Sequence, residues 1–98
     1  MPYRLVLHPT VAKTIASWGL SDPVLVDVYL YLREVLPLDP PRFLRRARQP
    51  FDGMLFEFEL IDSENRLRQH YFVFQVLYSQ DEQSLIIAKG GYERRDGI

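Results

Sequence analysis

The 98-residue sequence contains no cysteine, only two histidines and a single tryptophan. The absence of cysteine excludes disulfide bridges and zinc sites built on thiolates. No apolar run approaches the roughly 18 residues that a membrane-spanning helix needs, and no leading segment has the pattern of a secretory signal. Neither sign of charge is in large excess, because the net charge is −1. We therefore expect a cytoplasmic protein whose surface as a whole does not attract polyanions.

The composition is that of an ordinary soluble globular protein, with 47% hydrophobic and 26% charged residues. A chain of this length can bury one stable hydrophobic core without disulfide bonds. The sequence has no internal repeat and no stretch long enough to serve as a linker. We therefore expect a single domain that spans residues 1–98.

The central feature of the sequence is the stretch 70–92, which reads as a β-hairpin. Two strands, His70–Tyr78 and Ser84–Lys89, are rich in aromatic and β-branched residues and flank the polar turn Ser79–Gln83. The first strand is apolar on both of its faces, which is typical of a strand in the middle of a sheet. The paired glycines Gly90 and Gly91 predict a bulge or a chain reversal after the second strand.

The residues before this hairpin predict one strand and two helices. Tyr3–His8 has the pattern of a short strand, and Thr10–Trp18 has the spacing of an amphipathic helix that ends at Gly19. A second helix is expected over Val24–Leu36, with its apolar face toward the sheet. Residues expected to pack on the sheet face that carries Phe56 and Phe58 are Trp18, Leu25, Val28 and Leu32.

Between the helices and the hairpin, Pro41–Arg48 could form a short basic helix, and Met54–Ile61 alternates as a strand. The expected order is therefore β-α-α-β-β-β. The last three strands have connections too short for parallel crossovers, so they should form an antiparallel meander. The predicted class is α+β, with two helices covering one face of the meander.

Few residues have a pattern that indicates metal or nucleophile chemistry. His8 and His70 have no acidic residue at a ligand spacing, so we expect no metal and no cofactor. No serine lies in a nucleophile motif. Glu57 and Glu59 share one face of a strand and are best interpreted as its solvated side.

Basic and aromatic residues give a stronger indication, toward nucleic acid. Arginines can hold phosphates, and a tyrosine can stack on an unpaired base. The candidates for nucleic-acid binding are Arg42, Arg45, Arg46, Arg48 and Tyr71. The alternative is that these arginines form surface networks with nearby acids, in which case they would contact no nucleic acid.

Four segments, DPPRF, GMLFEFEL, HYFVFQV and IIAKGGYERRD, occur in an element order that covers most of the chain. Together they resemble the RelE/ParE superfamily of bacterial toxins from toxin–antitoxin systems. Members of this superfamily cleave messenger RNA on the ribosome or poison gyrase, and an antitoxin neutralises them by wrapping the sheet and helices. The resemblance implies a cognate antitoxin as partner, with the ribosome and mRNA as further partners, and it leaves the oligomeric state open.

The resemblance also implies a metal-independent cleavage in which the RNA 2′-hydroxyl attacks the adjacent phosphate. That reaction needs a proton carrier and cations to stabilise the charge on phosphorus. Either His70 or Tyr92 is the candidate proton carrier, because a neutral histidine suits a base at physiological pH and Tyr92 stands at a matching position. The candidate cations are Arg66, Arg68, Lys89, Arg94 and Arg95.

Two departures from the family pattern keep a second hypothesis open. Tyr71 or Phe72 stands where nuclease members carry an arginine, and Glu59 stands where another arginine is common. The first hypothesis is a ribosome-dependent mRNA endonuclease. The second is a catalytically degenerate module of the same fold that binds a protein, or a ParE-like inhibitor of a protein target.

Overall fold

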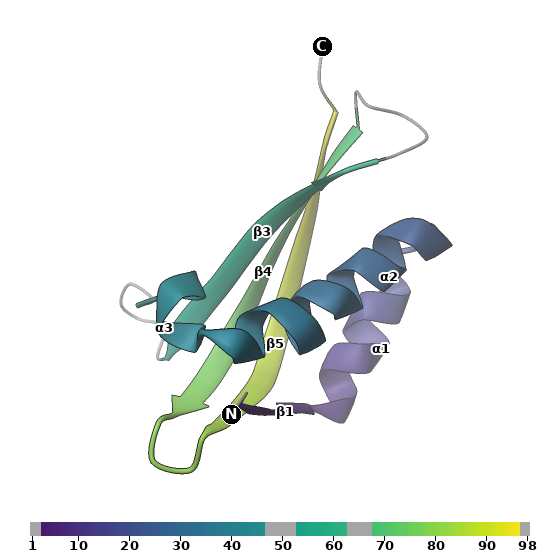
Figure 1. Ribbon diagram of the computed structural model, residues 1–98. Coiled ribbons are helices and arrows are strands. Elements are labelled where there is room, and N and C mark those ends of the chain that lie inside the picture. The colour runs from purple at the N-terminus through teal and green to yellow at the C-terminus, as the bar shows by residue number, and fades with distance from the viewer. Residues whose placement is uncertain (1–2, 47–52, 63–67, 97–98) are drawn as a thin grey trace.

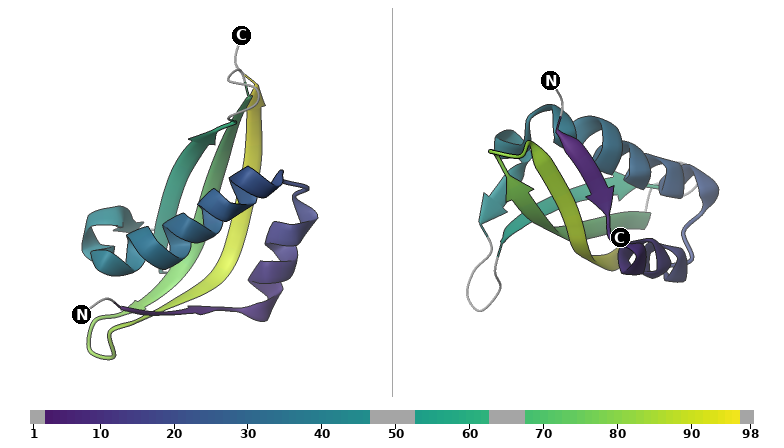
Figure 2. Two further views of the ribbon diagram at one scale, coloured as in Figure 1. Left: turned by 45° about the vertical axis from the view of Figure 1, so that its right-hand side comes forward. Right: turned by 90° about the horizontal axis from the view of Figure 1, so that it is seen from below.

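The computed structural model describes residues 3–46, 53–62 and 68–96. A five-stranded sheet has the order β1-β5-β4-β3-β2, with β1 parallel to β5 and the other neighbours antiparallel. The helices form a second layer against one face of this sheet (Figure 1, Figure 2). The predicted α+β class is confirmed, as is the meander with two helices on one face. In chain order, the elements are β1 (Arg4–Leu7), α1 (Pro9–Ser17), α2 (Asp22–Leu30), α3 (Pro40–Phe43), β2 (Leu44–Arg46), β3 (Met54–Ile61), β4 (Arg68–Ser79) and β5 (Ser84–Asp96).

Strand β4 occupies the centre of the sheet, as its two apolar faces predict. Phe72, Phe74 and Val76 are fully buried beneath the helices, whereas Leu77 on the opposite face is 47% exposed. Both hairpin strands are longer than the sequence predicts, and β5 continues seven residues past Lys89 to Asp96. This extension matters because it places the basic end of the chain in the sheet.

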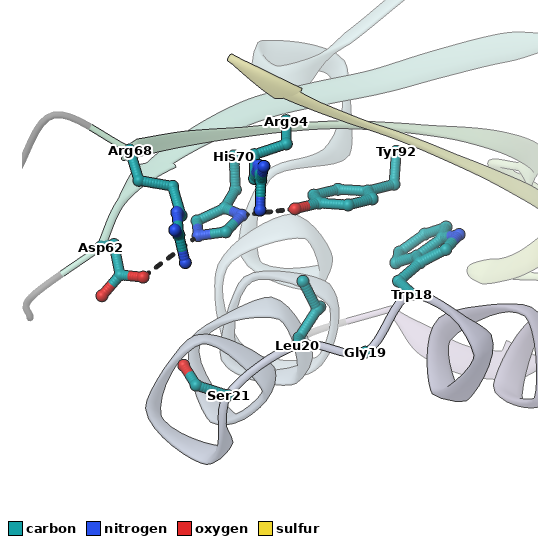
Figure 3. Close-up of a pocket in the computed structure, with 9 residues that line it drawn as sticks. All are labelled: Trp18, Gly19, Leu20, Ser21, Asp62, Arg68, His70, Tyr92 and Arg94. Carbon is teal, nitrogen blue, oxygen red and sulfur yellow. Dashed lines mark hydrogen bonds and ion pairs between the residues drawn. The ribbon is translucent and has the colours of Figure 1, made fainter. Parts of the chain in front are cut away.

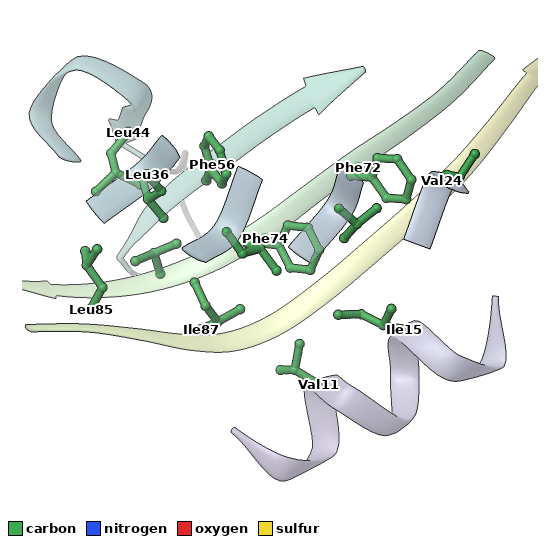
Figure 4. Packing of buried hydrophobic residues seen from close by; sticks show 13 residues of the cluster. Val11, Ile15, Val24, Leu36, Leu44, Phe56, Phe72, Phe74, Leu85 and Ile87 are labelled. Atoms are coloured by element: carbon green, nitrogen blue, oxygen red, sulfur yellow. The ribbon is translucent and has the colours of Figure 1, made fainter. Parts of the chain in front are cut away.

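The helices contribute a continuous apolar face to the core. Helix α2 is extended by a π-helical turn, η1 (Tyr31–Val35), and a 3₁₀ turn, η2 (Leu36–Leu38). Val28, Leu32 and Leu36 from this segment are fully buried, and they belong to one core cluster with the buried phenylalanines of the sheet. Figure 4 shows Leu36 and these phenylalanines within the cluster. Trp18 and Leu25 pack against the same core and are partly buried. The predicted packing of the helices on the sheet is therefore confirmed.

The predicted basic helix over Pro41–Arg48 is wrong over Leu44–Arg46. Helix α3 ends at Phe43, and Leu44–Arg46 instead forms the edge strand β2, in which Leu44 lies opposite Phe56 of β3. Leu44 is only 8% exposed, so pairing with β3 buries an apolar side chain in the core. Arg48 lies outside the described residues.

A bulge and a close contact define the middle of β5. Ala88 has no partner on β4, because Gln75 pairs with Lys89 while Val76 pairs with Ile87. Two residues later, a Cβ atom at Gly90 would lie 2.9 Å from the Phe74 ring and 3.3 Å from the Trp18 ring. The bulge thus lies before the glycines and not at them as predicted, because Gly90 and Gly91 pair regularly with Phe74 and Val73. Gly90 leaves room for two aromatic rings.

None of the helices within the described ranges is long and apolar enough to span a membrane.

Candidate functional site

A pocket of about 430 Å³ lies between the ends of β4 and β5 and the connection from α1 to α2. Gly19, with a φ of +66°, ends α1 and turns the chain across the mouth of this pocket. The lining residues are Trp18, Gly19, Leu20, Ser21, Asp62, Arg68, His70, Tyr92 and Arg94 (Figure 3). Aromatic, basic and acidic side chains therefore meet in one concave site.

The register of the hairpin explains this convergence. His70 lies directly opposite Arg94, and Phe72 lies opposite Tyr92. Arg68 precedes His70 by two residues on the same strand, so alternation places its side chain on the same face of the sheet. These side chains point from the sheet toward the helix connection (Figure 3).

His70 and Asp62 are buried titratable residues of the pocket. His70 is 5% exposed, and its Nδ1 atom lies 2.7 Å from the Tyr92 hydroxyl oxygen. On the other side of the ring, Nε2 lies 3.6 Å from Oδ2 of Asp62. The backbone N–H of Asp62 donates to the Arg68 carbonyl over 3.0 Å, which ties the end of β3 to the start of β4. Asp62, His70 and Tyr92 thus form a row across the pocket.

Aromatic packing fixes the position of Tyr92. Its ring stacks on Trp18 with centroids 5.4 Å apart and on Phe72 with centroids 5.3 Å apart. The half-buried phenol therefore presents its hydroxyl group to His70 and to the pocket. Because the ring is held on both sides, the hydroxyl has a defined position without help from a ligand.

Arg68 and Arg94 supply positive charge to the same pocket. A phosphate that entered the pocket would meet two guanidinium groups and the His70–Tyr92 pair. Guanidinium groups bind phosphate through charge-assisted hydrogen bonds. The arrangement can therefore hold a phosphodiester beside a proton carrier, which is the combination that phosphoryl transfer from a 2′-hydroxyl requires.

The open face of the sheet carries a different cluster of polar residues. Arg45 and Tyr71 both donate hydrogen bonds to the Glu57 carboxylate. The bond from Arg45, followed by that from Tyr71, lowers the pKa of Glu57, and the bond to Glu57 raises the pKa of Tyr71. Arg95 lies 4.6 Å above the Tyr71 ring and pairs with Glu59 at 3.2 Å. On this face the charges largely satisfy one another.

The structure brings some of the predicted site residues together and separates others. Arg68, His70, Tyr92 and Arg94 meet in the pocket. Arg95 lies on the opposite face over the ring of Tyr71, whose hydroxyl shares the Glu57 carboxylate with Arg45. Lys89 lines a separate apolar hollow of the open face together with Leu55, Val73, Gln75, Gly90 and Gly91.

The remaining candidates do not lie in the pocket. Arg42 is exposed and lies over the Phe43 ring, and Arg46 is exposed at the sheet edge. Arg66 lies outside the described residues, as does Arg48.

Sequence reasoning missed Asp62 and Trp18 as site residues. No sequence pattern indicates a functional role for Asp62, and Trp18 was expected only to pack on the sheet. The pairing of β3 with β4 was the signal that could have indicated Asp62. In an antiparallel pair the end of one strand lies beside the start of the next, so Asp62, just after β3, lies near the first residues of β4. Among the described residues, no group of three or more histidine and acidic side chains could hold a metal ion.

Comparisons with known proteins give no match to a protein-family model or to a curated protein. Two solved structures match over nearly the whole chain. A chain of the toxin–antitoxin complex RelBE2 from Mycobacterium tuberculosis has a TM-score of 0.64 at 14% sequence identity, covering 95% of this chain and 100% of that chain. A double arginine-to-alanine mutant of the E. coli toxin RelE in the free state has a TM-score of 0.57 at 18% identity, covering 93% and 83%. The chain therefore has a RelE-like fold.

Proposed function

We propose that this chain is the toxin of a toxin–antitoxin pair and that it cleaves RNA in the His70 pocket. One observation carries the proposal: a buried histidine bonded to a tyrosine hydroxyl faces a pocket that two arginines also line. The RelE-like fold supports the toxin assignment, since the solved structures that it matches are described as a toxin and a toxin–antitoxin complex. A cognate antitoxin is then the expected protein partner.

In the proposed reaction, the RNA 2′-oxygen attacks the adjacent phosphorus, the bond from phosphorus to the 5′-oxygen breaks, and the leaving 5′-oxygen takes a proton from solvent. The His70–Tyr92 pair accepts the proton of the 2′-hydroxyl. Arg68 and Arg94 bind the phosphate oxygens, on which negative charge accumulates in the transition state. No metal is needed for this step, because the 2′-hydroxyl is an internal nucleophile and the cations come from side chains.

The expected substrate is messenger RNA presented by the ribosome. A net charge of −1 and the pairing of Arg45 and Arg95 with glutamates give the chain little attraction for free RNA, because such attraction depends on unneutralised cations. A ribosome that holds the message in place would remove the need for tight RNA binding by the toxin itself.

The test is cell-free translation with the wild-type chain and two tyrosine variants. Tyr92→Phe keeps the ring that stacks on Trp18 but removes the hydroxyl, so we expect a loss of cleavage of about 10²-fold or more with an unchanged unfolding midpoint. Tyr71→Phe is the matched control on the open face and should cleave like the wild type. Primer extension on the translated message locates the cuts. A wild-type chain that neither cleaves mRNA nor slows growth would contradict the proposal.

The open face favours one alternative, a binding module or inhibitor that acts on a protein target. Its apolar hollow around Val73 and its internally paired charges resemble a protein-contact surface more than an RNA-binding one. In that case, Val73→Asp would abolish growth arrest while Tyr92→Phe would not. The endonuclease proposal predicts growth arrest that depends on Tyr92.

A further inference from the structure

We propose that Gly90 is a positioning residue of the His70 pocket, because its missing side chain lets the Trp18 ring pack directly on β5. From that place the Trp18 ring supports the Tyr92 ring, and the segment that follows it, Gly19–Ser21, lines the pocket. The inference rests on the proposed RNA cleavage and names what sets the shape of the site. Gly90 itself contacts no substrate and acts through Trp18.

The backbone at Gly90 does not by itself require glycine. Among the described residues, the glycines with a positive φ are Gly19 and Gly53, so Gly90 has a conformation that other residues can adopt. It also pairs regularly with Phe74 of β4. Because a glycine weakens the interior of a strand, its presence here is best explained by what a side chain would meet.

The space beside Gly90 is filled by two aromatic rings. A Cβ atom there would lie 2.9 Å from Cε1 and 3.1 Å from Cδ1 of Phe74, and 3.3 Å from Cη2 of Trp18. Favourable contacts between carbon atoms begin at about 3.5 Å, so both rings would have to shift. Phe74 is fully buried, whereas Trp18 is partly buried and borders the pocket (Figure 3). Since a close-packed core resists displacement, Trp18 is the ring that yields.

Trp18 transmits this contact to the site. Its ring stacks on Tyr92 with centroids 5.4 Å apart, and it contacts Phe72 and Phe74 with centroids 5.7 Å and 6.0 Å away. The Tyr92 hydroxyl oxygen lies 2.7 Å from Nδ1 of His70. A shift of the Trp18 ring would move the phenol that stacks on it, and would therefore change the geometry of the His70–Tyr92 pair.

The same ring fixes one wall of the pocket. The backbone N–H of Trp18 donates to the Ile15 carbonyl over 3.1 Å at the end of α1, and Gly19 then turns the chain with a φ of +66°. The segment Gly19–Ser21 follows and lines the pocket. Because the Trp18 side chain anchors the start of this segment, a methyl group at position 90 would alter the width of the pocket as well.

The free, full-length wild type tests the contact without any substitution. One Hα proton of Gly90 stands where a Cβ atom would be, so it lies against the Phe74 and Trp18 rings. We expect ring currents to shift the NMR resonance of that proton strongly upfield, and we expect a nuclear Overhauser contact between it and the Trp18 ring. A Gly90 that shows neither signal overturns the inference, whether or not the protein cleaves RNA.

Substitution of Gly90 tests the consequence for the site. Gly90→Ala should lower the rate of mRNA cleavage in cell-free translation by about 10- to 10²-fold, since a misplacement of about 1 Å can cost 10²-fold. Fluorescence emission from Trp18, the single tryptophan of the chain, should move to longer wavelength as its ring loses contact with β5. Gly91→Ala is the matched control, because its Cβ atom would instead lie 3.1 Å from Cγ1 of Val73 on the open face. It should change neither readout.

A stability control separates positioning from loss of folding. Leu85 is fully buried near the other end of β5, so Leu85→Val should lower the unfolding midpoint by truncating the core. Measured at a temperature where each variant is folded, it should keep the wild-type cleavage rate and the wild-type Trp18 emission. A loss of cleavage in Leu85→Val as large as that in Gly90→Ala would mean that Gly90 matters only for stability.

A double variant tests whether the rings carry the effect. Phe74→Leu removes Cε1, the ring atom that lies nearest to the Cβ position of Gly90, so an added methyl group can occupy the vacated space. In the Phe74→Leu background, Gly90→Ala should therefore cost much less cleavage and shift the Trp18 emission less than in the wild type. Equal losses in the two backgrounds would overturn the role of the ring contact.

The outcomes separate this inference from the proposed function. A folded Gly90→Ala that cleaves like the wild type, or a Gly91→Ala that loses as much, overturns the positioning role. If Gly90→Ala does not fold, the wild-type spectrum and the Phe74→Leu background decide. A protein that shows the contact between Gly90 and Trp18 and the emission shift, but never cleaves RNA, overturns the proposed cleavage and leaves the role of Gly90 in shaping the pocket supported.

Discussion

The two faces of the sheet are built from alternate residues of the same strands, yet they have opposite characters. On the helix-covered face, His70 and Tyr92 are packed among aromatic rings and border a pocket. On the open face, Tyr71 and Arg95 belong to a network of ion pairs and hydrogen bonds at the surface. Neighbouring residues such as Arg94 and Arg95 therefore lie in different environments. Strand position, more than residue type, separates a site from a solvated network.

The largest expected effect distinguishes the faces by stability. Phe72→Ala should lower the free energy of unfolding by about 3–5 kcal/mol, because it removes a fully buried ring and leaves a cavity. Leu77→Ala, on the open face of the same strand, should stay within about 0.5–1 kcal/mol. Urea unfolding of both variants measures the difference. Equal losses would mean that both faces are buried in solution.

The second prediction distinguishes the faces by chemistry. Arg94→Ala should lower the cleavage rate by about 10²–10³-fold, the loss typical for removal of one donor that stabilises transition-state charge. Arg95→Ala should leave cleavage nearly unchanged, because its side chain pairs with Glu59 and Glu93 on the other face. Both variants should keep the wild-type unfolding midpoint. A reversed ranking would place the reaction on the open face.

The smallest expected effect concerns pH and the open face. The pKa of Glu57 is lowered in the folded state by its bonds to Arg45 and Tyr71. A lowered pKa gives stability above the unfolded pKa, near 4.3 for glutamate, and this stability is lost as the pH falls through the folded value. Glu57→Gln should therefore lower the free energy of unfolding by less than about 1 kcal/mol at neutral pH. Below the unfolded pKa, the stability of this variant should fall less steeply with decreasing pH than that of the wild type.

Thermal unfolding between pH 3 and pH 7 measures this effect. Arg45→Gln removes the first partner of Glu57 and should flatten the same part of the curve. If neither variant changes how the unfolding midpoint falls at acidic pH, the network contributes nothing to folding in solution.

Much of the fold could be predicted from the sequence. Apolar residues on both faces of the stretch His70–Tyr78 indicated a central strand, and helical spacing indicated the face with Val28 and Leu32. Strand β2 could not be predicted, because three residues after a proline-rich turn have no period of their own. Leu44 becomes part of a strand only through its pairing with Phe56, which is a tertiary effect.

The site was less predictable for a related reason. The expected second hairpin strand ended at Lys89, so Tyr92, Arg94 and Arg95 could not be assigned to faces. The face of the sheet on which each of them lies depends on the length of β5 and on the unpaired residue Ala88. Asp62 approaches His70 only because β3 and β4 are paired in one register, and such a register is set by the packed sheet as a whole.

The bulge at Ala88 also bears on how this gene can change in length. Ala88 is the extra residue, because Ile87 and Lys89 already pair with the consecutive residues Val76 and Gln75 of β4. Loss of Ala88 would therefore leave a regular strand in which Tyr92 and Arg94 keep their face. With Ala88 still unpaired, loss of one residue between Lys89 and Tyr92 would instead turn Tyr92 and Arg94 toward the open side. In descendants of this sequence, a one-codon deletion at the bulge can thus be absorbed, whereas the same deletion just after it would remove both side chains from the pocket.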